Sequence, residues 1–403
     1  MILAASGSET AAAFVQLGLL VVLLGVLGRI ALRLRISPIP FYLMLGLVVG
    51  VSGADRTVQT QEFVDLAADI GVLLLLFMLG LEFTPRELTG ELRRHARSGV
   101  VDLVLNAAPG AVIGLVLGWS PVACVVLAGV TYISSSGVVS KLIDDLGRRG
   151  NRETSVVLGI LVLEDLAMIV FLPVLGVLLS GIGFASGLFD VAVAASIVAV
   201  VVIVAHRYGD RLSRMLWSGS DEVLLLSVLG LVLLVAGVVE QVDVSAAVGA
   251  FMVGVGLSGP VQERAADLIG PLRDLFAALF FLLFGLEVDL ASVPPVLLPA
   301  AVLAVVGVVT KVLTGEIAGR WAGRGPPGRW RAGTALVARG EFSVVIAGLG
   351  VAAGVEPELA PLTAAYVLIV TTTASLLVRW DRPPAWWPGA GRGGTPRQAV
   401  PSG

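Results

Sequence analysis

Two adjacent carboxylates, Glu164 and Asp165, stand in the middle of an otherwise apolar stretch, LGILVLEDLAMIVFLP. A charge near the centre of a bilayer costs at least about 2.5 to 3.5 kcal/mol on insertion scales, so such residues usually carry function. Adjacent residues point roughly 100° apart on a helix, so the two carboxylates cannot share one identical role. We expect one of them to face a cavity, where it can bind a cation or a proton, and the other to face a neighbouring helix.

Lys311 is expected at a similar depth in a later apolar stretch, VVGVVTKVLTGEIAG. Only two of the 27 basic residues are lysine. Lysine can lose its proton when buried whereas arginine stays charged, so this choice favours a charge-compensating partner for the acidic pair. The alternative is a plain buried ion pair that stabilises helix packing. The surplus of two carboxylates over one lysine favours a functional role.

Two further apolar stretches contain polar tracts that can unwind. Their polar residues are Thr131, Ser134, Ser135 and Ser136 in the first tract, and Arg339, Gly340 and Glu341 in the second. Gly and Ser tolerate non-helical backbone, and the free carbonyls of a broken helix can coordinate a cation. The alternative for the serines is helix packing by small residues. For Arg339 and Glu341 we favour a structural pair, or a cap of the broken helices, over direct transport.

The composition places all these residues in a membrane. Of 403 residues, 57% are apolar and 14% charged, and the mean hydropathy is +0.96, which excludes a soluble globular protein. Long unbroken apolar runs predict helices, because a membrane barrel shows short alternating segments instead. The fold class is therefore an all-α membrane protein. Thirteen spans are predicted near 12–28, 38–53, 66–83, 98–118, 121–140, 154–182, 185–206, 222–239, 243–259, 274–289, 296–319, 332–354 and 361–378.

The basic residues predict the orientation, because Lys and Arg in short loops stay on the cytoplasmic side. With thirteen spans, all but three of the 27 basic residues fall on one side. The exceptions are Arg56 on the other side, and Lys311 and Arg339 within spans. This partition predicts an N-terminus outside and a C-terminus inside.

An internal repeat links the two halves of the chain. The segment LLLLFMLGLEF at 73–83 is echoed by FFLLFGLEVD at 280–289, an offset of 205 residues. Ser52-Gly53 and Ser258-Gly259 repeat at nearly the same offset, which also places the two polar tracts opposite each other. Seven spans separate the two copies, so the five-helix repeats are inverted. Chance likeness of Leu-rich helices is the alternative; inverted repeats with broken helices indicate a midplane ion site and alternating access.

Together these motifs resemble the cation:proton antiporter-2 family of sodium/proton and Kef-type potassium/proton exchangers. The resemblance rests on ISSSGVVSKLIDDLG, LGILVLEDLAMI, FFLLFGLEVD, the lysine at 311 and ARGEFSVVIAGLG, and it covers about residues 12–380. It implies a homodimer with the sodium/proton antiporter-like fold, in which the broken helices cross. Its parts would be a scaffold and dimerisation domain (12–83 and 221–290), an ion-transporting core (98–182 and 296–380), a linking helix (185–206) and a disordered cytoplasmic tail (381–403).

The same resemblance implies roles for single residues. Asp165 takes the place of the family's ion- and proton-binding aspartate, and Glu164 that of the neighbour that pairs with the lysine, here Lys311. The chain departs from the sodium members, which typically carry two aspartates and an acidic residue in the first crossing helix. The ARGEF and LEDL segments are most similar to short potassium/proton antiporters that work with a separate cytoplasmic regulatory subunit.

We therefore expect exchange of K⁺ or Na⁺ for H⁺ across the plasma membrane. A sodium-coupled symporter of an organic acid is the alternative, although it would not normally need Lys311. An intramembrane enzyme is less favoured, because the sequence has neither a GxGD pair nor HExxH. With a single cysteine and two histidines, we expect no cofactor and no metal other than the transported cation. No nucleic-acid partner is expected.

Overall fold

The computed structural model of the chain is built from helices, and strands are absent from the residues that it describes. These are residues 2–34, 36–51, 58–81, 85–179, 211, 213–217, 219–241, 246–384 and 387. The helices are α1 (Ile2–Leu34), α2 (Ile39–Val51), α3 (Val58–Leu81), α4 (Pro85–Val116), α5 (Pro121–Tyr132), α6 (Ser136–Asp145), α7 (Thr154–Leu179), α9 (Asp221–Glu240), α10 (Ala246–Gly256), α11 (Pro260–Glu287), α12 (Val293–Trp321), α13 (Pro326–Ala335), α14 (Glu341–Ala352) and α15 (Leu359–Leu377), with a 3₁₀ turn at Leu290–Ser292.

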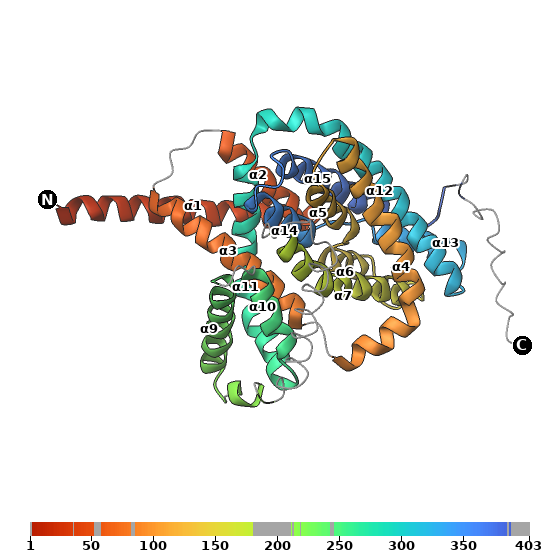
Figure 1. Cartoon of the computed structure of the whole chain (residues 1–403), viewed down its shortest axis with the longest axis horizontal. Helices are drawn as coiled ribbons and strands as arrows, with labels where there is room; N and C mark the ends of the chain where they lie inside the picture. Colours follow the sequence, from red (N-terminus) through yellow and green to blue (C-terminus); the bar gives the residue numbers. More distant parts are fainter. Residues whose placement is uncertain are drawn as a thin grey trace, which may run out of the picture.

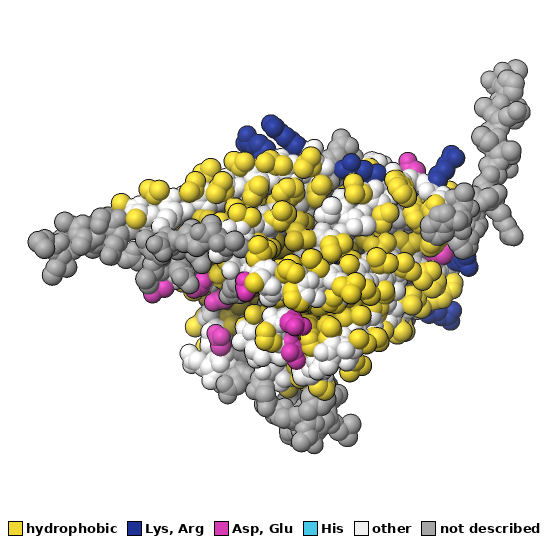
Figure 2. Space-filling model, turned by 90° about the horizontal axis from the view of Figure 1, so that it is seen from above, with side chains coloured by type: hydrophobic (Ala, Val, Ile, Leu, Met, Phe, Trp, Pro, Cys, Tyr) yellow, Lys and Arg dark blue, Asp and Glu magenta, His cyan; other side chains and the backbone are white. Residues whose placement is uncertain are grey.

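Nine helices within the described ranges are long and apolar enough to cross a bilayer. Two shorter apolar helices, Ile39–Gly50 and Glu341–Ala352, accompany them. Apolar side chains cover the face seen in Figure 2, with Lys and Arg gathered at its upper and right margins and Asp and Glu mainly at its lower left. The prediction of an all-α membrane fold is confirmed. The count of thirteen spans and the orientation stay predictions, since the expected helix at 185–206 lies outside the described residues.

The two polar tracts interrupt their helices. The predicted span 121–140 forms α5 and α6, which are separated by residues 133–135, and the predicted span 332–354 forms α13 and α14, separated by residues 336–340. The second span begins six residues earlier than predicted, at Pro326. Proline is favoured in the first turn of a helix, because its missing N–H would have no partner there. Each break therefore lies between two half-helices, as the tracts predict.

Close glycine contacts join helices of one repeat to helices of the other. A Cβ atom at Gly254 of α10 would lie 2.2 Å from the carbonyl oxygen of Phe77 in α3. A Cβ atom at Gly285 of α11 would lie 2.3 Å from the carbonyl oxygen of Leu43 in α2. Small residues at such crossings let two backbones touch. The repeat matches α2 with α10 and α3 with α11. It therefore relates the contact between α2 and α11 to the contact between α10 and α3, as expected of a repeated unit. The Ser52-Gly53 match lies outside the described residues.

The buried apolar side chains of the described residues fall into separate clusters. One cluster joins α3, α9, α10 and α11, and a larger one joins α5, α7, α12, α14 and α15 and extends to residues of α2, α3, α10 and α11. In Figure 1, α9 and α10 lie together in a lobe beside the larger body that holds the two breaks, and α1 projects away from both. The broken helices thus lie within the larger cluster, among tightly packed side chains.

Candidate ion-binding site

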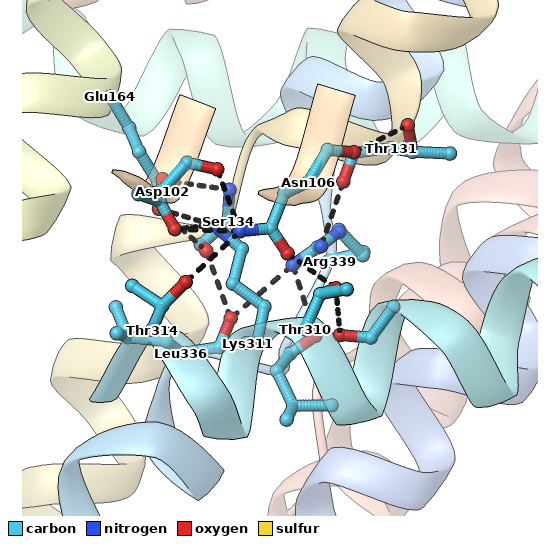
Figure 3. Close-up of polar contacts among 12 residues, drawn as sticks. Asp102, Asn106, Thr131, Ser134, Glu164, Thr310, Lys311, Thr314, Leu336 and Arg339 are labelled. Atoms are coloured by element: carbon cyan, nitrogen blue, oxygen red, sulfur yellow. Dashed lines mark hydrogen bonds and ion pairs between the residues drawn. The ribbon is translucent and has the colours of Figure 1, made fainter. Parts of the chain in front are cut away.

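Glu164 lies midway along α7 and is 1% exposed. Its carboxylate accepts hydrogen bonds from Lys311 Nζ at 2.6 Å and from Ser134 Oγ at 3.0 Å. The backbone N–H of Ser134 donates to the other carboxylate oxygen. Figure 3 shows these groups converging from α7, α12 and the break between α5 and α6. Charge-assisted hydrogen bonds of this kind stabilise the ionised carboxylate in the interior.

Lys311 is fully buried on α12, where it lies between two carboxylates. Besides Glu164, its ammonium donates to Asp102 Oδ1 at 2.8 Å. Its Nζ also lies 5.6 Å from the centre of the Tyr132 ring, within cation–π range. The contact between Lys311 and Glu164 that the sequence analysis predicted is present in the structure. The contact with Asp102 was missed.

Asp102 lies on α4 and is fully buried. The sequence carries a signal for it, a carboxylate in the apolar run VVDLVLN with Asn106 one helical turn further on. The sequence predicted two carboxylates, Glu164 and Asp165, against one lysine, and this count must be corrected. Asp102 is a third buried carboxylate, and it contacts the ammonium of Lys311 together with Glu164. Asp102 Oδ2 is buried and has no hydrogen-bond partner.

Asn106 connects Asp102 to the neighbouring helices. Its Nδ2 donates to Asp102 Oδ1 at 2.9 Å and to Thr314 Oγ at 3.3 Å. Its Oδ1 accepts from Thr310 Oγ at 2.8 Å, and its main-chain carbonyl accepts from Thr131 Oγ at 2.9 Å. This network ties α4 to the stretch of α12 that carries the lysine and to the end of α5 (Figure 3).

Arg339 is fully buried between the two breaks. Its guanidinium donates to the carbonyl of Thr131 at 2.8 Å and to those of Leu336 and Val337 at 3.3 Å. A further bond at 3.1 Å reaches the hydroxyl of Tyr366. The last carbonyls of a helix lack intrahelical partners and carry partial negative charge, so a cation there is stabilising. The geometry is that of a cap for the ends of α5 and α13, the role favoured from the sequence.

The two breaks also touch each other. The N–H of Ser135 donates to the carbonyl of Ala338 at 2.9 Å, and its Oγ donates to Glu341 Oε2 at 2.8 Å. A Cβ atom at Gly340 would lie 2.5 Å from Ser135 Oγ, so a side chain there would collide with the other break. Ser136 is the first residue of α6 and is partly buried. The polar tracts are thus brought together at one crossing.

Asp165 follows Glu164 on α7 and is 4% exposed. Tyr132, the last residue of α5, lies within electrostatic range of both carboxylates and of Asp102. The acidic pair, the lysine and the first break are therefore assembled in one buried region. The roles of these residues in ion and proton binding stay predictions.

Comparisons with known proteins agree with this arrangement. Residues 19–380 match the model of the family described as "Sodium/hydrogen exchanger, transmembrane". The K(+)/H(+) antiporter subunit KhtU of Bacillus subtilis is 33% identical over 90% of this chain and 92% of its own length. The ammonium/H(+) antiporter subunit AmhT of Alkalihalophilus pseudofirmus is 31% identical over 82% of this chain and 85% of its own.

The fold is also found among solved structures. The sodium proton antiporter MjNhaP1 of Methanocaldococcus jannaschii superposes with a TM-score of 0.70 over 92% of this chain and 99% of its own, at 17% identity. That likeness shows the shared fold. The family match over residues 19–380 establishes that the chain belongs to the sodium/hydrogen exchanger family of membrane transporters.

Proposed function

We propose that this multi-pass membrane protein is a secondary antiporter that exchanges K⁺ or Na⁺ for H⁺, with Asp165 and Glu164 as its binding carboxylates. The observation that carries the site is the position of Glu164 halfway along an apolar helix. There its carboxylate accepts hydrogen bonds from a buried ammonium and from Ser134 in the break of a helix. Transporters of inverted-repeat architecture place their ion sites at such breaks near the membrane midplane. The fold and the family of the chain support the same activity.

The coupling follows from competition at one site. A buried carboxylate without a counter-ion is costly in a bilayer, and either a cation or a proton removes that cost. When the cation binds, Asp165 is ionised; when a proton binds, the cation is excluded. The core domain can then cross between its two orientations only when loaded with one of the two. Exchange requires no separate proton pathway.

A symporter for organic acids is the second class of function that the sequence left open. Lys311 argues against it, since the lysine is fully buried and shares its charge between two carboxylates. Such a cluster suits binding of small cations and protons. The printed names of two relatives, a K(+)/H(+) and an ammonium/H(+) antiporter subunit, make K⁺ and NH₄⁺ the first cations to compare with Na⁺.

The test is transport by the purified protein in liposomes that contain a pH-sensitive dye. An imposed K⁺, NH₄⁺ or Na⁺ gradient should move protons through the wild type beyond the response of protein-free liposomes, in which NH₃ diffusion alone shifts the pH, and Asp165→Asn should lower the response for every cation to that baseline. Asp267→Asn makes the same chemical change on an exposed side chain of α11 and should behave as wild type. Near-normal exchange by correctly folded Asp165→Asn would move the site to Glu164 or Glu341. Sodium-dependent uptake of an organic acid would favour the symporter.

We infer further that the chain works as a homodimer and with a separate regulatory subunit. The projecting α1, with exposed apolar residues such as Phe14 and Val22, supports a contact between copies within the membrane. Both relatives carry the word subunit in their printed names. Native mass spectrometry of the detergent-purified protein should give twice the monomer mass. Purification from native membranes should retain a soluble partner. A monomer mass in the first experiment would contradict the homodimer, and the absence of a second kind of chain in the second would contradict the regulatory subunit.

A further inference from the structure

The ammonium of Lys311 has two carboxylate partners of nearly equal distance. Glu164 Oε1 lies 2.6 Å from Nζ and Asp102 Oδ1 lies 2.8 Å from it, and all three side chains are almost completely buried. Asp102 belongs to α4, so it is part of neither the acidic pair on α7 nor either helix break. The lysine therefore does not depend on Glu164 alone for compensation of its charge.

Asp102 is positioned so that it can remain the counter-ion of Lys311 after the lysine leaves Glu164. Asn106 donates to Oδ1 of Asp102 and is itself fixed by Thr310, which fixes the carboxylate relative to α12. The other oxygen, Oδ2, is buried without a partner. An ammonium carries three N–H donors. A lysine released from Glu164 can thus keep its bond to Oδ1 and form a second one to Oδ2 of the same carboxylate.

We propose that Asp102 is the second anchor of Lys311, which holds the ammonium while the transported cation occupies Glu164 and Asp165. Cation binding requires Glu164 to exchange the lysine for the cation. Without Asp102, that exchange would leave a buried ammonium with no counter-charge, a state that is strongly disfavoured in a protein interior. Asp102 lowers the cost of the exchange without touching the ion, so it is a positioning residue. This inference rests on the proposed function.

The experiment is a double-mutant cycle in liposomes at one fixed pH, with wild type, Asp102→Asn, Lys311→Gln and the double variant. In Asp102→Asn, Glu164 becomes the only counter-ion of Lys311, so the cation competes less well. The apparent KM for the cation should rise about tenfold, with the maximal rate within roughly twofold of wild type. In the Lys311→Gln background no ammonium has to be held, and the same substitution should leave KM unchanged.

Three controls keep this cycle decisive. Asp102→Glu retains the charge and should restore most of the affinity, and Asp267→Asn should match wild type. The cation-dependent rise in the thermal unfolding midpoint gives the binding affinity independently of transport, because a ligand that binds the native state stabilises it. It should show the same pattern across the four variants.

An unchanged KM in Asp102→Asn would overturn the anchor. So would a rise in KM that persists in the Lys311→Gln background, because the effect would then be a general disturbance of packing. The proposed function fails in a different way, through absence of exchange in wild type or full exchange in Asp165→Asn. The two failures therefore cannot be confused.

Discussion

The two helix breaks are related by the internal repeat, yet their donor groups meet different acceptors. The break between α5 and α6 directs the N–H and Oγ of Ser134 towards the carboxylate of Glu164. The break between α13 and α14 carries a guanidinium, Arg339, which donates to carbonyls at the ends of both α5 and α13. One break thus supplies donors to Glu164, and the other supplies a positive charge to the carbonyls at the ends of α5 and α13.

This difference separates ion binding from structural support. Polar backbone at membrane depth is tolerated only where its groups find partners inside the protein. At the first break the partner is a carboxylate of the site, and at the second it is a fixed guanidinium. Substitutions at Arg339 should therefore act mainly on stability, and substitutions at Ser134 mainly on cation affinity. The predictions below test that separation.

The largest effect is expected for Arg339→Met. Each carbonyl that loses its donor in the interior costs about 1–3 kcal/mol, and Arg339 serves Thr131, Leu336 and Val337. The free energy of unfolding should fall by about 3 kcal/mol or more, seen as a lower midpoint of thermal unfolding in detergent. Arg382→Met removes an exposed arginine and should leave the midpoint unchanged. If both variants melt together, Arg339 is not the cap of the breaks.

A smaller effect is expected where the breaks touch. In Gly340→Ala the new Cβ would lie 2.5 Å from Ser135 Oγ and 2.6 Å from its Cβ, so the crossing must open. Overpacking of this kind costs about 1–3 kcal/mol. Gly237→Ala on α9 is the matched control, since nothing lies within 4 Å of that site, and it should be neutral or slightly stabilising.

Removal of the Ser135 side chain should relieve the collision with the new Cβ atom at residue 340. Combining Gly340→Ala with Ser135→Gly removes both atoms in the way and should recover most of the lost thermal stability. An unrescued double variant would mean that the loss arises elsewhere, and that the breaks do not need to approach so closely.

The adjacent serines of the first break separate affinity from support. Ser134 Oγ lies 3.0 Å from Glu164 Oε1 and 2.9 Å from the carbonyl oxygen of Leu336, whereas Ser135 Oγ donates to Glu341 of the other break. Hydrogen bonds to charged groups contribute about 1.5–3 kcal/mol, so Ser134→Ala should raise the KM for the cation roughly tenfold. Ser135→Ala should weaken affinity by no more than a few-fold. Equal KM values for the two variants in liposomes would show that the hydroxyl of Ser134 does not contribute to cation affinity.

Much of this site was predictable from residue types and depth. The serine and Arg-Gly-Glu tracts predicted both breaks, because Gly and Ser weaken a helix, and the lone intramembrane lysine predicted its contact with Glu164. Asp102 was missed for a physical reason. Hydropathy begins the fourth span at residue 98 and so places Asp102 near a membrane surface, where a carboxylate is expected to face solvent, whereas in the structure its side chain is fully buried. Which carboxylate then meets the lysine depends on how α4 and α12 pack, which sequence spacing cannot specify.

The smallest expected effect concerns Glu153, which joins the start of α7 to α13. Arg331 Nε donates to its carboxylate at 2.6 Å. Burial alone would raise the pKa of Glu153, but hydrogen bonds from Arg331 and from the backbone, with the charge of Arg331, lower this pKa below its usual range. A carboxyl group whose pKa is lower in the folded state contributes stability at neutral pH, and this contribution is lost as the pH falls through the folded pKa. Because Arg331 is partly exposed, we expect less than about 1 kcal/mol.

Glu153→Gln should therefore melt slightly below wild type at pH 7, and the gap should close as the pH falls below about 4, the ordinary range of a glutamate. Glu62→Gln, on an exposed side chain of α3 beyond its first turn, should show no gap at either pH. A gap of constant size from pH 7 to pH 3 would mean that Glu153 acts through packing. The link between the helix of the acidic pair and the second break would then not depend on charge, and its strength would be independent of the protons that the antiporter moves.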